Sequence, residues 1–153
     1  MSALRIDIAD LLAHPGARRE VSQAEVLNGL GGVATRVEGP VQIDLTLDRI
    51  SDGVVARGPV PATWEAECSV CLGDLHRTVQ AHVDELFETT PIDGETYPIE
   101  GHEIDLEQLV RDNILLDLPI APRCADPCAD LSADASSSSD PDPRWAALSE
   151  LEL

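Results

Sequence analysis

The stretch VEGPVQIDLTLDRI, Val37 to Ile50, alternates apolar and polar side chains with a period of two. The apolar positions are Val41, Ile43, Leu45 and Leu47, and the polar ones are Gln42, Asp44, Thr46 and Asp48. Successive side chains of an extended chain point to opposite faces, so this pattern predicts a β-strand with one buried face. The period of two begins near Val33.

Further extended runs follow. SDG, Ser51 to Gly53, predicts a turn, and VVARGPVPATWEAECSV after it predicts a second strand. Pro59 and Pro61 within that strand indicate a sheet edge or a bend, because proline cannot donate to a β-ladder. CLGDL then predicts a tight turn, and HRTVQAHVDELFE, residues 76–88, predicts a third strand.

The pattern becomes helical in DLEQLVRDNILLDLP, where Asp105 suits an N-cap and Pro119 ends the helix. A short final helix is expected with Asp142 as its cap, Pro143 at its first position and Trp145 on its apolar face.

These elements predict an α+β fold: an antiparallel sheet or small open barrel from about Val33 to Glu88, packed against a main helix at Asp105–Leu118. We expect an N-terminal segment at 1–32, the core domain at 33–122, and a Cys-containing, Ser-rich tail with a terminal helix at 123–153. The termini are expected to be more mobile than the core.

Charge is the most unusual feature of the composition. The chain of 153 residues has a net charge of −19, and every basic residue is an arginine. Residues 51–153 hold 22 acidic residues against five arginines, a net charge of −17. Such a surface repels nucleic-acid phosphates, so we expect no DNA binding. The acidity either attracts a basic protein or serves solubility alone.

The chain contains neither a recognisable membrane-spanning segment nor a recognisable signal peptide. It has no apolar run long enough to cross a membrane. Asp7 and Asp10 interrupt the position where a signal peptide needs an apolar region. A cytoplasmic protein without membrane contact is therefore expected. The oligomeric state is left open.

Four cysteines form two pairs, Cys68-x2-Cys71 and Cys124-x3-Cys128. In a reducing compartment such pairs indicate metal or redox chemistry more often than disulfides. Four thiolates suit a closed tetrahedral structural zinc site, and Gly73 is expected to let the backbone fold beneath the sulfurs of the first pair.

Two alternatives to zinc remain open. The cysteines of a vestigial site would simply be small buried apolar residues. A redox pair at Cys68 and Cys71 needs an activated thiolate, which the acidic surroundings should disfavour. His76 is a spare ligand, whereas His14, His82 and His102 have no partners at a recognisable spacing.

No catalytic constellation is found. The sequence has no phosphate-binding glycine loop, no Gly-x-Ser-x-Gly elbow and no His-Glu-x-x-His motif. DASSSSDPDP lacks the central glycine and final glutamate of a calcium loop. We therefore expect a protein that is not an enzyme.

Several motifs in order resemble the bacterial YceD family, the large ribosomal RNA subunit accumulation proteins. They are CSVCL after a strand with Gly and Pro, then VDELF, IDLEQLVRDNILLDLPIAPRC and DPRWAALSEL. The match covers most of the chain, from about Arg36 to the C-terminus. The resemblance implies a cytosolic, non-enzymatic factor that supports accumulation or processing of large-subunit ribosomal RNA, without established catalytic residues. All four cysteines match family positions.

Partners and alternatives follow from combining the resemblance with the charge. An acidic factor would act by holding a basic ribosomal protein, or the pre-ribosomal large subunit, and would contact ribosomal RNA indirectly. The alternatives are a generic acidic protein-binding module with a structural zinc, and a thiol redox protein.

The chain departs from the family in one place. Family members often carry a Gly-Leu-Cys-x-x-Cys-Gly knuckle before the terminal Asp-Pro-Arg, whereas here ADLSADASSSSDP, residues 129–141, contains no cysteine. A metal site in this chain is then either incomplete or built from the two surviving pairs.

Overall fold

The computed structural model describes residues 3–125, 128 and 143–150. It has an α+β fold that consists mostly of sheet, and the main sheet is open. The strands are β1 (Arg5–Asp7), β2 (Arg18–Val26), β3 (Thr35–Glu38), β4 (Pro40–Arg49), β5 (Val54–Glu67), β6 (Asp74–Glu88), β7 (Tyr97–Pro98) and β8 (Glu103–Asp105). The helices are α1 (Ala9–Ala13), α2 (Leu106–Asp117) and a 3-10 helix, η1 (Pro143–Glu150).

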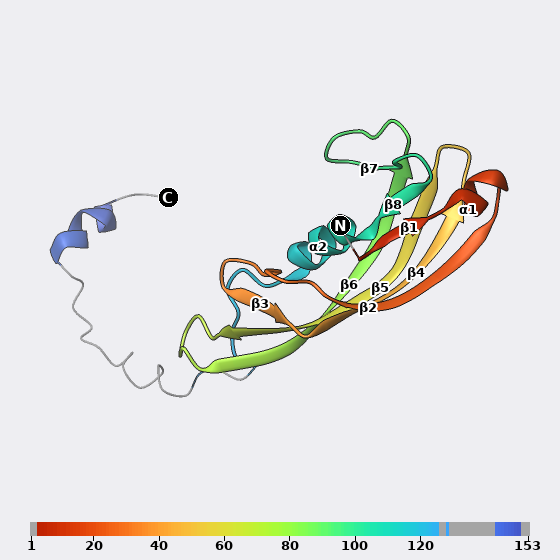
Figure 1. Ribbon diagram of the computed structural model, residues 1–153. Coiled ribbons are helices and arrows are strands. Elements are labelled where there is room, and N and C mark those ends of the chain that lie inside the picture. The colour runs from red at the N-terminus through yellow and green to blue at the C-terminus, as the bar shows by residue number, and fades with distance from the viewer. Residues whose placement is uncertain (1–2, 126–127, 129–142, 151–153) are drawn as a thin grey trace.

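The main sheet has the order β2-β4-β5-β6-β7, with β3 pairing β5 beside this path. All pairs are antiparallel except β6 with β7, which are parallel. Strands β1 and β8 form a separate antiparallel pair. Figure 1 shows the main sheet as a curved layer, with α2, β1 and β8 gathered on one side of it.

Strand β4 confirms the alternating pattern, since its four apolar positions are all buried. The predicted turn at Ser51–Gly53 joins β4 to β5, and the Ile50 N–H donates to the Gly53 carbonyl at 2.9 Å. Gly53 has a further role that the sequence did not indicate. A Cβ on this residue would lie 1.9 Å from the carbonyl oxygen of Phe87.

The prolines of β5 occupy an interval where the strand has one neighbour only. Strand β6 flanks β5 along its whole length, but β4 pairs only as far as Arg57, and β3 pairs only from Thr63. Pro59 and Pro61 lie between these limits. They therefore interrupt no ladder on the unpaired side, as expected for a local edge.

The first 32 residues contribute more structure than their sequence suggested. Strand β2 was not predicted, yet it pairs with β4 over nine residues. Buried side chains from this segment belong to the same hydrophobic cluster as those of the main sheet: Leu4, Ile6, Ile8, Leu11, Val21, Leu27 and Leu30. The sheet thus extends beyond the expected limits of Val33 and Glu88 at both ends.

Helix α2 begins and ends as predicted. The Asp105 carboxylate accepts a hydrogen bond from the Glu107 N–H at 2.9 Å, and Leu118 is the C-cap before Pro119. The buried side chains of α2 are Leu106, Leu109, Val110 and Ile114, all members of the hydrophobic cluster. Tyr97 Oη also donates to the Asp112 carboxylate at 2.9 Å, which ties the helix to β7.

The final helix begins at Pro143 as expected, but it has 3-10 geometry. Its proposed cap, Asp142, lies outside the described residues, as do residues 129–141. Within the described part of the chain, no helix is long and apolar enough to cross a membrane.

Candidate metal centre

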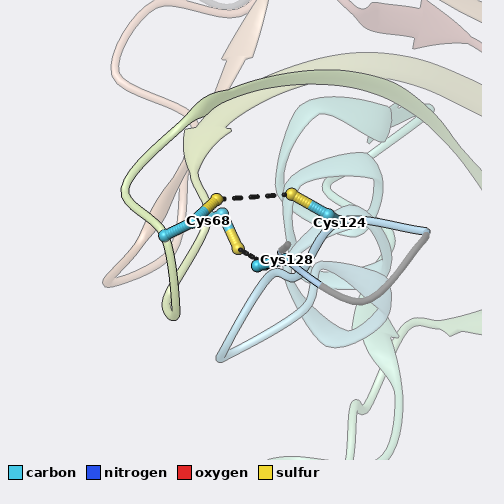
Figure 2. A group of neighbouring side chains, drawn as sticks. Cys68, Cys124 and Cys128 are labelled. Atoms are coloured by element: carbon cyan, nitrogen blue, oxygen red, sulfur yellow. Dashed lines mark hydrogen bonds between the residues drawn. The ribbon is translucent and has the colours of Figure 1, made fainter. Parts of the chain in front are cut away.

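The four cysteines meet at one end of the molecule, although they come from two distant segments. Cys68 and Cys71 lie in the connection between β5 and β6, and Cys124 and Cys128 follow α2. All four sulfur atoms lie within 4.8 Å of one another. Figure 2 shows the side chains of Cys68, Cys124 and Cys128 converging from these two parts of the chain.

A backbone hydrogen bond holds the two segments together beside the sulfurs. The Ser69 N–H donates to the Pro122 carbonyl at 2.8 Å. Pro122 is buried and lies two residues before Cys124. No residue type predicts this contact, because a backbone carbonyl can accept a hydrogen bond from the N–H of almost any residue.

The connection at residues 68–73 forms a tight loop around the sulfur of Cys68. The Leu72 N–H donates to the Cys68 carbonyl at 2.9 Å, and the Cys68 N–H donates to the Gly73 carbonyl at 2.8 Å. The Val70 N–H points to Cys68 Sγ at 3.5 Å. Within this loop Leu72, a residue with a side chain, takes the left-handed conformation with φ 61°.

The sulfur positions suit a tetrahedral metal. Cys68 Sγ lies 3.5 Å from Cys128 Sγ, and Cys71 Sγ lies 3.5 Å from Cys124 Sγ. Four thiolates bound to zinc at about 2.3 Å would lie about 3.8 Å apart. The spacing observed therefore needs only small adjustments to hold such an ion. All four cysteines are free thiols.

The pKa of Cys68 is shifted in the opposite direction to those of Cys124 and Cys128. Backbone N–H groups of Cys71 and then Val70 lower the pKa of Cys68 to about 5. Hydrogen bonds to the sulfurs of Cys71, Cys68 and Cys128 raise the pKa of Cys124 to about 12. The pKa of Cys128 is also raised, chiefly by its hydrogen bond to Cys68.

This pattern corrects one expectation and supports the metal-site interpretation. The thiolate of Cys68 is favoured despite the acidic composition of the chain, because backbone N–H groups donate to its sulfur and lower its pKa. Cys124 and Cys128, whose pKa values are raised, would have to lose their protons before four thiolates form. The positive charge of a bound divalent cation would make this deprotonation of the thiols favourable.

The donor set has the character of a structural centre. Cys68 is fully buried, and the other three cysteines are half-buried. Four thiolates fill the tetrahedral positions around zinc and leave none for a reacting water or substrate. Such a centre would hold the two segments of the chain together.

The histidines lie outside this group. Among residues 3–125, 128 and 143–150, the group of possible metal ligands around these sulfurs consists of the four cysteines and includes no histidine. His76 lies on β6 opposite Glu65, and His14 Nδ1 contacts the Asp10 carbonyl oxygen at 3.0 Å. The spare-ligand role considered for His76 therefore has no support in the geometry.

Comparison with known proteins agrees with the motifs in the sequence. Residues 56–152 match the family described as large ribosomal RNA subunit accumulation protein YceD. Uncharacterized proteins of Mycobacterium tuberculosis and Mycobacterium bovis are 34% identical over 172 residues, covering 98% of this chain and 82% of theirs. One from Mycobacterium leprae is 31% identical over 173 residues, covering 99% of this chain and 78% of its own.

No solved structure matches the chain significantly. The family match includes all four clustered cysteines and helix α2. The chain therefore belongs to the YceD family of large ribosomal RNA subunit accumulation proteins.

Proposed function

We propose that this protein is a non-enzymatic cytoplasmic factor that supports accumulation or processing of large-subunit ribosomal RNA. The observation that carries the proposal is the family match over residues 56–152. The thiol cluster is consistent with a non-enzymatic role, because four cysteine ligands would fill every coordination position of a zinc ion and leave none for a substrate.

The factor acts on ribosomal RNA through a protein. A net charge of −19 opposes contact with phosphates, since RNA affinity depends largely on cationic side chains that displace counterions. The same charge attracts basic proteins and speeds their encounter. The partner is therefore a basic ribosomal protein, free or on the pre-ribosomal large subunit, which the acidic surface shields from non-specific RNA binding.

Zinc has a structural role in this proposal. Cys68, Cys71, Cys124 and Cys128 hold the ion, which supplies counter-charge for four thiolates. The bound centre fixes the segment after α2 against the connection between β5 and β6.

A thiol redox function is the second candidate, because the pKa of Cys68 is lowered to about 5. Reactive cysteines combine a lowered pKa with access to the substrate. Cys68 is 0% exposed, so it lacks that access. The lowered pKa instead suits a metal ligand, which must be a thiolate.

Deletion of the gene in its source organism tests the proposal. We expect the ratio of large-subunit to small-subunit ribosomal RNA to fall, and the wild-type gene to restore it. Purified protein should show no tight binding to ribosomal RNA at physiological salt. An unchanged ratio would contradict the ribosomal role and leave a generic acidic binding module with a structural zinc, whereas tight RNA binding would contradict indirect action.

A further inference from the structure

A groove of about 710 Å³ lies beside the cysteine cluster. Its walls are residues 32–36, which lead into β3, residues 65–69 at the end of β5, and residues 74–76 at the start of β6. Leu72 completes the lining, and Cys68 belongs to both the groove and the thiol cluster. The groove is thus formed where the tip of the sheet meets the proposed metal centre.

Two carboxylates face each other in this groove. Glu67 and Asp74 are direct partners in the β5–β6 register, and both are exposed. Like charges at directly opposed positions destabilise a sheet. Glu65 nearby is paired with Arg36, but neither Glu67 nor Asp74 forms an ion pair within the described part of the chain.

A buried hydroxyl in the same groove has no partner. Thr35 is 5% exposed, and its Oγ1 makes no hydrogen bond among the described residues. Gly32 leaves space beside it, because a Cβ on Gly32 would lie 3.1 Å from this oxygen. A buried hydroxyl that has lost its water without gaining a hydrogen-bond partner lowers the stability of the folded state.

Apolar surface is presented at the same place. Val33 is fully exposed and Leu72 is 69% exposed. Leu72 also has a φ of 61°, a conformation that is unfavourable for a residue with a Cβ and easily adopted by glycine. The Leu72 side chain therefore neither packs into the hydrophobic core nor suits its own backbone conformation.

Three locally unfavourable features therefore line one groove: opposed carboxylates, an unpaired hydroxyl and a strained, exposed leucine. Departures of this kind gather at functional sites, where a ligand compensates for them. A cation would relieve the repulsion between Glu67 and Asp74, a polar group would satisfy Thr35, and an apolar side chain would cover Leu72 and Val33.

We propose that this groove binds an extended segment of a basic protein, with an Arg or Lys side chain between Glu67 and Asp74 and an apolar side chain on Leu72 and Val33. The inference rests on the proposed function, because it identifies where the basic partner docks. Its chemistry excludes an RNA ligand, since the unpaired charges of the groove are carboxylates.

The probe is a fluorescein-labelled peptide of alternating Arg and Leu, and its binding to the full-length protein is followed by fluorescence anisotropy. The double variant Glu67→Gln/Asp74→Asn should weaken binding by about tenfold, because it removes the two carboxylates that attract the cation. Asp93→Asn/Glu95→Gln is the matched control, since it removes the same charge from an exposed loop outside the groove. It should bind as the wild type does.

Two further variants separate binding from folding. Thr35→Val keeps the shape of the side chain but removes the unpaired hydroxyl, and Leu72→Gly relieves the left-handed backbone. Each should leave the melting temperature equal to or above that of the wild type, with the metal content unchanged. Each should nevertheless weaken peptide binding several-fold.

Equal affinity of the double variant and its control would overturn the proposal, as would equal binding of a peptide that alternates Glu and Leu. Copurification from cells distinguishes this failure from failure of the ribosomal role. If basic ribosomal proteins copurify equally with wild type and the double groove variant, the groove is not the docking site but the function stands. If groove-dependent peptide binding holds while no ribosomal protein copurifies, the groove stands and the function fails.

Discussion

Cys68 and Cys128 are 60 positions apart in the chain, yet their sulfur atoms lie 3.5 Å apart. Between them the chain forms β6, β7, β8 and α2 before it returns to the tip of the sheet. A metal ion bound by both segments would cross-link the two ends of this long stretch of chain. Such a cross-link reduces the conformational entropy of the unfolded chain. The centre should therefore contribute to the stability of the whole domain.

Protein purified without chelators should contain one zinc ion per chain, because the four sulfurs form one closed donor set. Removal of the metal with a strong chelator should lower the melting temperature by several degrees. Elemental analysis and thermal unfolding check these outcomes. Metal-free protein with the same melting temperature would instead indicate a vestigial cluster.

Replacement of one ligand should have a similar effect. Cys68→Ser should abolish stoichiometric zinc binding and destabilise the protein strongly, since Cys68 is fully buried and belongs to both the cluster and the core. His76→Ala is the control, because His76 lies near the cluster in sequence but outside the group of ligands. Loss of zinc from the His76 variant alone would refute the four-cysteine assignment.

Gly53 should tolerate no side chain. The Cβ of alanine would collide with the Phe87 carbonyl at 1.9 Å, so Gly53→Ala should cost about 3 kcal/mol of unfolding free energy. Gly16→Ala is the comparison, because that position has φ 79° with open space around it and should cost about 1 kcal/mol. Urea denaturation measures both, and equal losses would mean that the close contact at Gly53 is not present.

Glu85 should make stability depend on pH. Burial, followed by repulsion from Asp84 and Asp112, raises the pKa of Glu85 above its usual value of 4.5. The folded state thus holds this proton more tightly than the unfolded state does. Its contribution to stability is complete below the unfolded pKa and is lost as the pH rises through the folded pKa.

Glu85→Gln should accordingly raise the melting temperature at neutral pH, and the gain should vanish in acid. Any lost carboxylate reduces the self-repulsion of so acidic a protein. Asp52→Asn, in the exposed turn between β4 and β5, controls for that general effect. Equal gains in the two variants across the pH range would contradict a specific role for burial of Glu85.

The elements with strong local patterns could be predicted from the sequence. Alternation placed β4, and a capping aspartate together with a proline placed α2, because both signals act within a few residues. The Cys-x2-Cys and Cys-x3-Cys pairs likewise indicated all four members of the cluster. A short loop between two cysteines lets both sulfurs reach one metal ion, so the spacing can be recognised within a few residues of sequence.

Features that depend on distant parts of the chain could not be predicted. Strand β2 begins with Arg18, Arg19 and Glu20, and it is a strand because β4 pairs along it. Tertiary context of this kind overrides local preference. The left-handed backbone of Leu72 could not be predicted either, because glycine is the usual residue in that conformation and nothing in the sequence around Leu72 indicates an exception.

The proposed function requires that the protein act on large-subunit ribosomal RNA through a basic protein partner. A tagged pull-down from growing cells, divided into RNase-treated and untreated halves, tests it most directly. We predict that a basic large-subunit ribosomal protein is enriched in both halves and that precursor RNA is enriched only in the untreated half. Release of every ribosomal component by RNase would show that RNA mediates the binding, and it would contradict direct binding of a basic ribosomal protein.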